Sequence, residues 1–256
     1  MKVGLNLFSI KNLLTTEEDF FNTVKSLKEM GYSYMQFSGA EFIPDRIKRI
    51  SERLEMPVCL THVPMDRIIN DTDKLMEEHS LFGCKNIGLG MMPFEVVADE
   101  KQFKETVALL NDAGKRMAAK GFKFFYHHHH FEFFKHNGQT AFDYMIENAP
   151  YINFTVDTYW LQFGGVDVKE TLRKLKGRIE CAHLKDYQIV YTEGGQPRPF
   201  APEFAPIGDG VMDFPSIIEV MKDSGVKYFL VEQDNASRLP DTLAQVQRSI
   251  EYLKKL

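Results

Sequence analysis

A unit that repeats along the chain constrains its fold more than any other feature of the sequence. In each unit a short, β-rich apolar run is followed by a polar turn and then by an amphipathic stretch with helical spacing. Strands that alternate with helices predict parallel pairing, because two parallel strands need a crossover long enough to hold a helix. The pattern predicts eight strands, over residues 2–9, 33–37, 57–62, 85–90, 122–129, 153–157, 180–185 and 227–232. It predicts helices over residues 16–30, 44–54, 66–82, 99–120, 140–148, 168–176, 214–224 and 241–254.

Eight such units in 256 residues predict an α/β protein with the architecture of a (β/α)8 barrel, or TIM barrel. An open, doubly wound sheet is the rival architecture, but no Gly-x-Gly-x-x-Gly run follows the first strand. No linker rich in Pro or Ser divides the chain, so we expect a single domain over residues 1–256. The stretch 187–214 holds four prolines, and we expect an irregular lid or rim loop there.

Local signals mark the ends of the predicted helices. Thr15 and Glu18 have the spacing of a capping box, in which each side chain satisfies a backbone amide of the first turn. Glycine commonly ends a helix because it adopts the left-handed conformation without a steric penalty. Five glycines stand at such positions: Gly31, Gly83, Gly121, Gly177 and Gly225.

The overall charge and the cysteines exclude several classes of partner. The net charge is −5, with 31 basic residues spread among 36 acidic ones, so we expect no nucleic-acid binding. The three cysteines, Cys59, Cys84 and Cys181, are widely spaced, which suits reduced thiols in a cytoplasmic protein. No stretch approaches the roughly 18 apolar residues that a membrane span needs, so we also expect no membrane partner.

Polar residues gather at the predicted strand ends. In a TIM barrel the C-terminal ends of the strands carry the chemistry, while the opposite rim contributes stability. Convergence of His, Asp and Glu on one barrel mouth would suit a single divalent metal such as Mn²⁺, Co²⁺, Fe²⁺ or Zn²⁺, with positions left for substrate oxygens. The strand-end residues are Thr61, His62, the run 127–130, Asp157, His183, Lys185, Asp186, Glu232 and Asp234.

Each of these residues also has a structural interpretation. Asp157 is placed as a helix cap would be, and His183 as a core histidine with satisfied hydrogen bonds would be. Glu232 follows an apolar strand, where a carboxylate is costly unless it is paired or bound to a metal. Strand alternation puts His127 and His129 on one face and their neighbours on the other, unless the run lies on the surface. The coincidence across neighbouring strands favours the metal site.

Five motifs in order resemble the xylose-isomerase-like TIM-barrel superfamily. They are Tyr-His-His-His-His-Phe-Glu-Phe at 126–133, Val-Asp-Thr-Tyr-Trp at 156–160, His-Leu-Lys-Asp at 183–186, Ile-Gly-Asp-Gly-Val-Met-Asp-Phe at 207–214 and Val-Glu-Gln-Asp at 231–234. Within the superfamily the chain is similar to the sugar phosphate isomerase/epimerase group, which includes inosose dehydratases and ketose epimerases. The resemblance covers nearly the whole chain, but it specifies no substrate.

The resemblance implies a divalent metal held by Glu, Asp, His and Glu from the last four barrel strands. Asp157, His183 and Glu232 match three of these ligands, but histidines stand where many members have the first Glu. We expect His129 as the fourth ligand, followed by Glu132 and then His127.

The resemblance also implies proton transfer through an enediolate, for which Glu232, Glu132 and His62 are the candidate catalytic residues. The candidate substrate-binding residues are His127, Trp160, Lys185 and Asp186. Trp160 is equally interpreted as rim packing, and Asp186 as a residue that orients His183.

The expected function is therefore isomerisation or epimerisation of a ketose or keto-sugar. One alternative is dehydration of a keto-inositol or 3-keto-glycoside, which passes through the same enediolate. A second is a carbohydrate-binding barrel without catalysis, because the first Glu is missing. An apurinic endonuclease shares the barrel, but the acidic balance argues against it. The expected partner is a small sugar or keto-polyol, and a homo-oligomer stays open.

Overall fold

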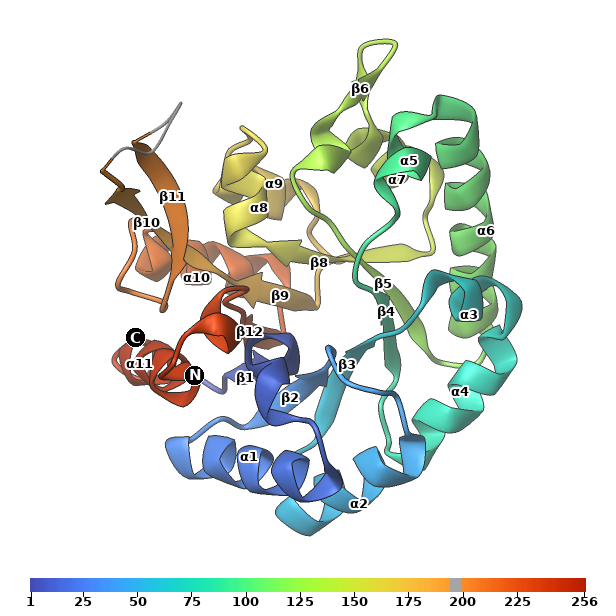
Figure 1. Ribbon diagram of the computed structural model, residues 1–256. Helices are drawn as coiled ribbons and strands as arrows, with labels where there is room; N and C mark the ends of the chain where they lie inside the picture. Colours follow the sequence, from blue (N-terminus) through green and yellow to red (C-terminus); the bar gives the residue numbers. More distant parts are fainter. Residues whose placement is uncertain (194–198) are drawn as a thin grey trace.

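The computed structural model describes residues 1–193 and 199–256, and its centre is a closed barrel of eight parallel strands (Figure 1). Each strand is short and almost wholly buried, because helices cover the outside and side chains fill the inside. All eight predicted strands and the predicted α/β barrel are confirmed. In order around the barrel they are β1 (Gly4–Asn6), β2 (Tyr34–Phe37), β3 (Val58–His62), β4 (Asn86–Leu89), β5 (Lys123–His127), β8 (Ile152–Asp157), β9 (Cys181–Leu184) and β12 (Tyr228–Val231).

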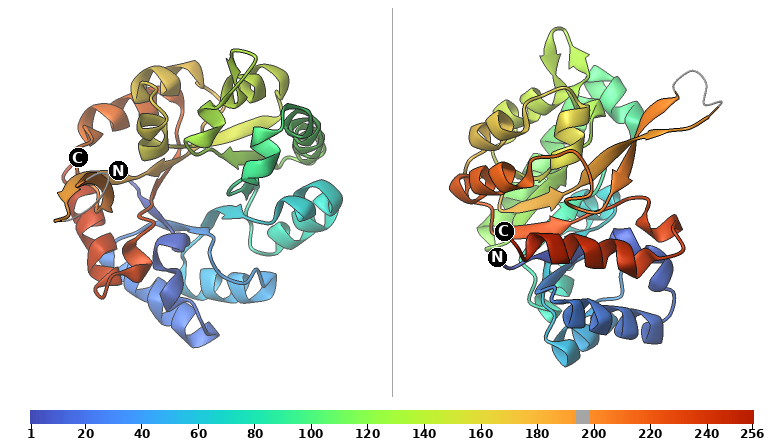
Figure 2. Two further views of the ribbon diagram at one scale, coloured as in Figure 1. Left: turned by 45° about the horizontal axis from the view of Figure 1, so that its top comes forward. Right: turned by 90° about the vertical axis from the view of Figure 1, so that its left-hand side faces the viewer.

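Helices form a ring around this barrel, as the left view of Figure 2 shows. They bury one apolar face each against the strands and expose the other. The predicted helix over 66–82 is two helices that meet at Asp71, whose backbone is not helical. The main helices are α1 (Glu17–Met30), α2 (Pro44–Leu54), α3 (Met65–Asn70), α4 (Thr72–Leu81), α6 (Glu100–Ala119), α7 (Ala141–Asn148), α9 (Val168–Lys174), α10 (Phe214–Ser224) and α11 (Thr242–Leu253).

The capping signals are confirmed in part. All five predicted terminating glycines have positive φ, from 71° at Gly83 to 101° at Gly31. The capping box at α1 lies one residue later than predicted: Thr16 and Asp19 form it. Thr15 instead donates its hydroxyl hydrogen to Asp19 Oδ2 over 2.5 Å, so Thr15 supports the box from outside.

Several short elements after the strands were not predicted. The helices α5 (Phe94–Ala98) and α8 (Thr158–Phe163) begin within a few residues of a strand end, too short for a clear helical period. The strands β6 (Lys135–His136) and β7 (Gln139–Thr140) form a small hairpin, and 3-10 turns cover Leu7–Leu13, Phe131–Phe133 and Ala236–Arg238.

The stretch 187–214 is not an irregular loop throughout, as its prolines had suggested. It contains most of an antiparallel hairpin of β10 (Asp186–Tyr191) and β11 (Phe200–Ala205), which projects from the barrel in the right view of Figure 2. Pro202 lies within β11, where an edge strand tolerates a residue that cannot donate a ladder hydrogen bond. The part of the expected loop at 194–198 lies outside the described residues.

The barrel interior is apolar towards the N-terminal ends of the strands. Six buried side chains form this inner cluster: Tyr34, Cys59, Leu60, Phe125, Cys181 and Leu230. All three cysteines are buried free thiols, as expected. Among the described helices, none combines the length and apolarity required to cross a bilayer.

Candidate metal centre

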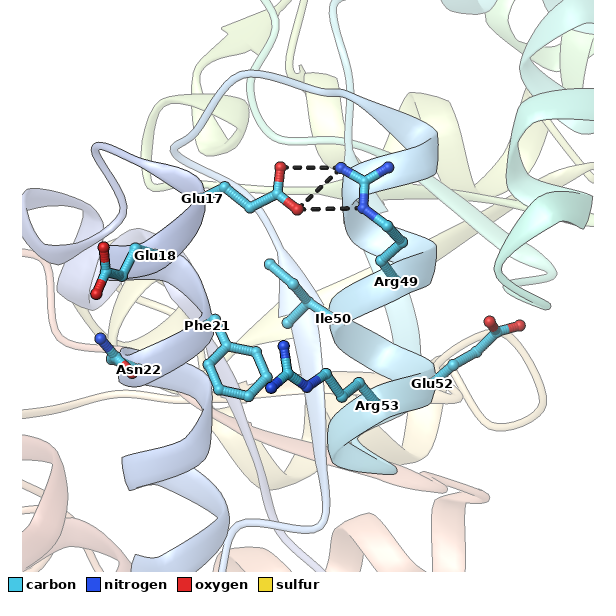
Figure 3. Close-up of a pocket in the computed structure, with 8 residues that line it drawn as sticks. All are labelled: Glu17, Glu18, Phe21, Asn22, Arg49, Ile50, Glu52 and Arg53. Atoms are coloured by element: carbon cyan, nitrogen blue, oxygen red, sulfur yellow. Dashed lines mark hydrogen bonds and ion pairs between the residues drawn. The ribbon is translucent and has the colours of Figure 1, made fainter.

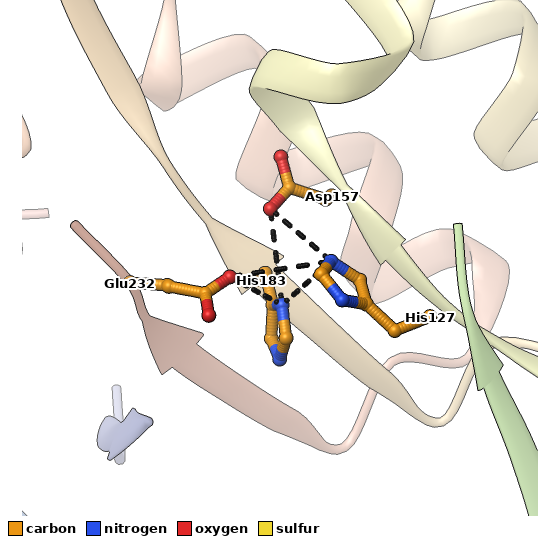
Figure 4. A group of neighbouring side chains, drawn as sticks. All are labelled: His127, Asp157, His183 and Glu232. Carbon is orange, nitrogen blue, oxygen red and sulfur yellow. Dashed lines mark hydrogen bonds and ion pairs between the residues drawn. The ribbon is translucent and has the colours of Figure 1, made fainter. Parts of the chain in front are cut away.

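Four side chains converge at the C-terminal mouth of the barrel (Figure 4). His127 ends β5, Asp157 ends β8, His183 lies in β9, and Glu232 directly follows β12. Each offers one ligand atom, and the four atoms lie within 4.8 Å of one another. His127 Nε2 is 3.5 Å from Asp157 Oδ2, and His183 Nδ1 is 2.8 Å from Glu232 Oε2. All four residues are buried, so the group lies at the closed bottom of the mouth.

Both carboxylates are held by their outer oxygen. The backbone N–H of Trp160 donates to Asp157 Oδ1 over 3.0 Å, because Asp157 caps the N-terminus of α8. Asn6 Nδ2 of β1 donates to Glu232 Oε1 over 2.6 Å. These bonds leave Asp157 Oδ2 and Glu232 Oε2 facing the centre, where neither buried oxygen accepts a hydrogen bond of regular geometry.

Both imidazoles are held in the same way by their outer nitrogen. His127 Nδ1 donates to the Gly90 carbonyl over 3.1 Å. His183 Nε2 donates to Gln36 Oε1 over 2.7 Å. In the neutral rings the lone pairs of His127 Nε2 and His183 Nδ1 therefore point into the centre, as outer hydrogen bonds arrange them in metal sites.

The donor set fits a divalent metal. Two imidazole nitrogens and two carboxylate oxygens suit Mn²⁺, Fe²⁺, Co²⁺ or Zn²⁺. Buried carboxylate oxygens without hydrogen bonds are costly unless a cation compensates them. Burial alone lowers the pKa of His183, but Glu232 and Asp157 raise that pKa to about 9, so a metal would displace a proton from this ring.

A lysine ammonium already lies beside the centre. Lys185 Nζ is 3.0 Å from Asp157 Oδ2 and 3.0 Å from Glu232 Oε2. Burial opposes ionisation of Asp157, but Lys185, His127 and His183 together outweigh it and hold the pKa of this carboxyl well below its usual range. The pKa of Glu232 is lowered against burial by His183 and Lys185. Both carboxyls are therefore ionised at neutral pH.

A pocket of about 290 Å³ opens above these side chains. Its floor is polar, while Phe8 and Met91 contribute apolar wall. This volume is near the lower end for small-molecule sites, which suits a ligand the size of one monosaccharide. The lining residues are Phe8, Ser38, His62, Gly90, Met91, His127, His129, Lys185, Glu232 and Asp234.

The structure brings most of the predicted site residues together. Asp157, His183 and Glu232 lie together in this group, and its fourth member, from β5, is His127, where the sequence prediction had put His129 first. The reason is that β5 ends at His127, after which the chain turns towards the 3-10 segment Phe131–Phe133. His129 instead lines the pocket, where its buried Nδ1 finds no hydrogen-bond partner among the described residues.

The four consecutive histidines have four different environments. As alternation predicted, His127 and His129 both line the pocket, with ring centroids 4.6 Å apart. His128 faces away, and its Nε2 accepts a hydrogen bond from the Asp157 backbone N–H over 3.1 Å. His130 stacks on Trp160 with centroids 5.2 Å apart. The run is therefore not a surface tract.

Three predicted residues belong neither to the group of four converging side chains nor to the pocket lining. Glu132 is buried behind the turn, where Tyr126 Oη donates to it over 2.5 Å and the His129 N–H over 2.8 Å. Asp186 accepts hydrogen bonds from four backbone N–H groups, those of Tyr187, Gly208, Gly210 and Met212. Trp160 packs beside Lys185, whose Nζ lies 5.1 Å from the centroid of its ring.

The sequence prediction missed Asn6 and Gln36, and it placed Asp234 at a strand end without giving it a role. Gln36 connects two of the histidines, because its Nε2 donates to His62 Nε2 over 3.0 Å while its Oε1 accepts from His183. Asn6 and Gln36 are isolated polar residues within buried strands, which is a signal that the sequence does contain. Asp234 lines the pocket two residues after Glu232.

A second hollow, of about 730 Å³, lies between α1 and α2 and shares no residue with the mouth (Figure 3). Arg49 and Glu17 pair across it, and the Arg53 guanidinium lies 4.2 Å from the Phe21 ring centroid. The Arg49–Glu17 pair is exposed, in contrast to the buried ionic groups at the mouth.

The fold and the mouth together define a TIM-barrel protein with a buried group of two histidines and two carboxylates that fits a divalent metal. The chain belongs to the xylose isomerase-like TIM barrel family, whose model matches residues 24–256.

Individual relatives agree with this assignment. The chain is 27% identical over 180 residues to an inosose dehydratase of Clostridium perfringens, a match that covers 62% of this chain and 56% of that protein. The chain thus spans about half the length of the curated relatives it matches. Two solved structures, each described as a sugar phosphate isomerase/epimerase from Parabacteroides distasonis, share its fold. One has a TM-score of 0.80 at 20% identity and covers 99% of this chain and 93% of its own. The other has a TM-score of 0.78 at 26% identity and covers 100% and 98%.

Proposed function

We propose that the protein is a divalent-metal-dependent sugar isomerase or epimerase that acts through an enediolate on a ketose or keto-sugar. The observation that carries the proposal is that a hydrogen bond orients each of the four candidate ligands towards the centre. Each has its outer atom held by a hydrogen bond and its inner atom directed at a common point. The names of the solved relatives support the reaction class.

His127, Asp157, His183 and Glu232 would hold the ion. When bound, the ion supplies Lewis-acid chemistry to the neighbouring oxygens of a carbonyl and a hydroxyl.

The pocket residues would move the proton. Glu232 lines the pocket as the candidate carboxylate base, and His62 is the candidate second proton carrier. Burial, with help from His127 and His183, lowers the pKa of His62 well below its usual value, so this imidazole is neutral at physiological pH. His129 and Asp234 line the same pocket and would orient hydroxyl groups. Return of the proton to the neighbouring carbon gives an isomer, and return on the opposite face gives an epimer.

Dehydration of a keto-inositol or 3-keto-glycoside is the second candidate reaction. The sequence similarity to inosose dehydratase favours it. The proton abstraction would be the same, but a β-hydroxyl would leave instead of the proton returning. A product that has lost water separates this reaction from the first.

Metal analysis is the first test. We expect the purified protein to bind one equivalent of Mn²⁺, Co²⁺ or Zn²⁺, and Asp157→Ala to bind none. Asp143→Ala, which removes an aspartate paired with Lys174 on the outer surface, is the matched control and should keep full metal binding. If the wild type takes up none of these metals, or if Asp157→Ala binds as much as the wild type, the proposal is wrong. A carbohydrate-binding barrel without catalysis then becomes the better hypothesis.

Solvent-deuterium exchange is the second test. The metal-loaded protein is incubated in D2O with ketoses, 3-keto-glycosides and inososes, and deuterium at the carbon next to the carbonyl is measured. Incorporation into at least one class is expected. Absence of incorporation in every class would count against the enediolate.

A further inference from the structure

Lys185 occupies a position that none of the roles above explains. It follows β9 directly, and only 1% of it is exposed. Its Nζ lies 3.0 Å from Asp157 Oδ2 and 3.0 Å from Glu232 Oε2. These are the two inner oxygens of the candidate metal centre. The ammonium therefore shares its partners with any metal that binds there.

The surroundings of Lys185 stabilise a cation. Trp160 and Phe204 present their rings at 5.1 and 5.5 Å from Nζ, within the range of cation–π attraction. Two ionised carboxylates in a buried site need a positive charge close by. Lys185 supplies that charge from within the chain, so the centre does not depend on an ion for its charge balance.

A third carboxylate offers Lys185 another partner. Asp234 Oδ1 and Oδ2 lie 3.1 and 3.2 Å from Nζ. Asp234 differs from the other two carboxylates, because it is not one of the four converging ligands and its side chain is 22% exposed at the pocket. The ammonium can therefore keep a partner if Asp157 and Glu232 are engaged elsewhere.

We propose that Lys185 is an internal counter-ion that competes with the divalent metal for Asp157 and Glu232, and that Asp234 holds the ammonium when the metal is bound. This inference rests on the metal centre of the proposed function. Two cations in one buried group repel strongly at such distances. The metal affinity is consequently lower than the four ligands alone would give, and the fold tolerates loss of the ion.

The test measures the dissociation constant of Mn²⁺, by electron paramagnetic resonance of the free ion, for the wild type and a small set of variants. Lys185→Met keeps the length of the side chain and removes its charge, and we expect it to bind Mn²⁺ at least about tenfold more tightly. Asp234→Asn should bind Mn²⁺ more weakly, because Lys185 loses its alternative partner. Lys123→Met removes a lysine that pairs with Glu180 on the outside of the barrel, and its affinity should stay within about twofold of the wild type.

Two further readouts separate competition from a purely structural role. Lys185→Met should melt at a lower temperature than the wild type without metal, and Mn²⁺ should raise its melting temperature by more than it raises that of the wild type. In the double variant the effect of Asp234→Asn should largely disappear, since Asp234 acts through Lys185. An effect of the same size with and without Lys185 would overturn the role of Asp234.

The outcomes distinguish this inference from the proposed function. If the wild type binds Mn²⁺ and Lys185→Met binds it no more tightly, the counter-ion role is wrong while the metal centre stands. If neither protein binds Mn²⁺, the metal centre itself fails. If Lys185→Met does not fold, Asp234→Asn decides, and an unchanged affinity in that variant overturns the proposal.

Discussion

The barrel interior holds two layers of side chains, two residues apart on the same strands. One layer is mainly apolar, and the other is polar and charged. The layer nearer the N-terminal ends is apolar or satisfied, and the layer at the mouth carries the candidate ligands and their supports. Because strand side chains alternate, residues two positions apart on a strand face the same side. Each residue of the layer nearer the N-terminal ends therefore lies below a residue of the layer at the mouth. The lower layer contains Tyr34, Leu60, Phe125, Cys181 and Leu230, and the upper layer contains Gln36, His62, His127, Asp157, His183 and Glu232.

The lower layer fills the barrel with apolar side chains and leaves no hydroxyl of Tyr34 unsatisfied. Tyr34 Oη accepts from the Phe229 N–H over 2.9 Å and donates to the Lys2 carbonyl over 3.0 Å, so its buried hydroxyl is satisfied. Gly4 leaves room for the ring, because a Cβ at this position would lie 2.2 Å from Tyr34 Cδ2. The upper layer instead concentrates buried charge that only a cation can balance. One strand pattern therefore serves stability at one step and chemistry at the next.

The largest expected effect comes from the upper layer. Asp157→Asn keeps an oxygen that can cap α8 but loses the charge that faces the centre. Loss of an outer-shell partner commonly weakens metal binding by 10–100-fold, so loss of this ligand should weaken Mn²⁺ binding by more than about 100-fold. The melting temperature without metal should change by less than about 4 °C, or about 1 kcal/mol. Calorimetric titration and thermal melts measure the two quantities; a large loss of stability with intact binding would reverse the assignment of the layers.

The lower layer should respond in the opposite way. Phe125→Ala removes a fully buried ring directly below His127, and we expect the free energy of unfolding to fall by about 3–5 kcal/mol. Mn²⁺ binding at a temperature where the variant is folded should change by less than about tenfold. Denaturant titration gives the stability, and Phe125→Leu is the control with a loss below about 1.5 kcal/mol. If metal binding falls as far as in Asp157→Asn, the layers are not separable.

A residue of the upper layer that is not a ligand should have an intermediate effect. Gln36→Leu removes the acceptor that orients His183 and the donor to His62. We expect Mn²⁺ affinity to fall by about 10–100-fold. Gln36→Glu keeps an oxygen for His183 and should retain most of the affinity. Equal affinities for the leucine and glutamate variants would show that the hydrogen bond to His183 does not support the site.

The layers also explain what the sequence could and could not predict. The barrel follows from the alternation of strands and helices, and Asp157, His183 and Glu232 were visible because each stands at a strand end. The choice of His127 over His129 depends on where β5 stops pairing with β8, since His127 opposite Thr155 is their last pair. That end point is set by tertiary packing.

The missed residues have different causes. Gln36 was detectable in principle, because it stands two residues after Tyr34 in an otherwise apolar strand. Asn6 occupies the same kind of position in β1. The hairpin of β10 and β11 was hidden by its prolines. Asp186 was predicted at the mouth because it follows β9, but its carboxylate is used by the backbone of the loop that returns from the hairpin.

The smallest expected effect concerns Glu132, which belongs to neither layer and accepts hydrogen bonds that hold the turn after β5. Burial raises its pKa to about 7 from an ordinary value of 4.5, so the folded protein retains a proton that the unfolded chain has already lost. Stability is therefore greatest below the unfolded pKa and falls as the pH rises towards 7, by about 1 kcal/mol between pH 6 and pH 7. Glu132→Gln should flatten this dependence of stability on pH, as measured by denaturant titration at several pH values, and leave Mn²⁺ affinity unchanged.

Because the Glu132 carboxylate accepts hydrogen bonds from Tyr126 and from the His129 backbone outside the pocket, deuterium exchange into the substrate should also survive the substitution. Loss of exchange with normal folding and metal binding would instead make Glu132 part of the catalytic machinery and extend the functional region beyond the upper layer.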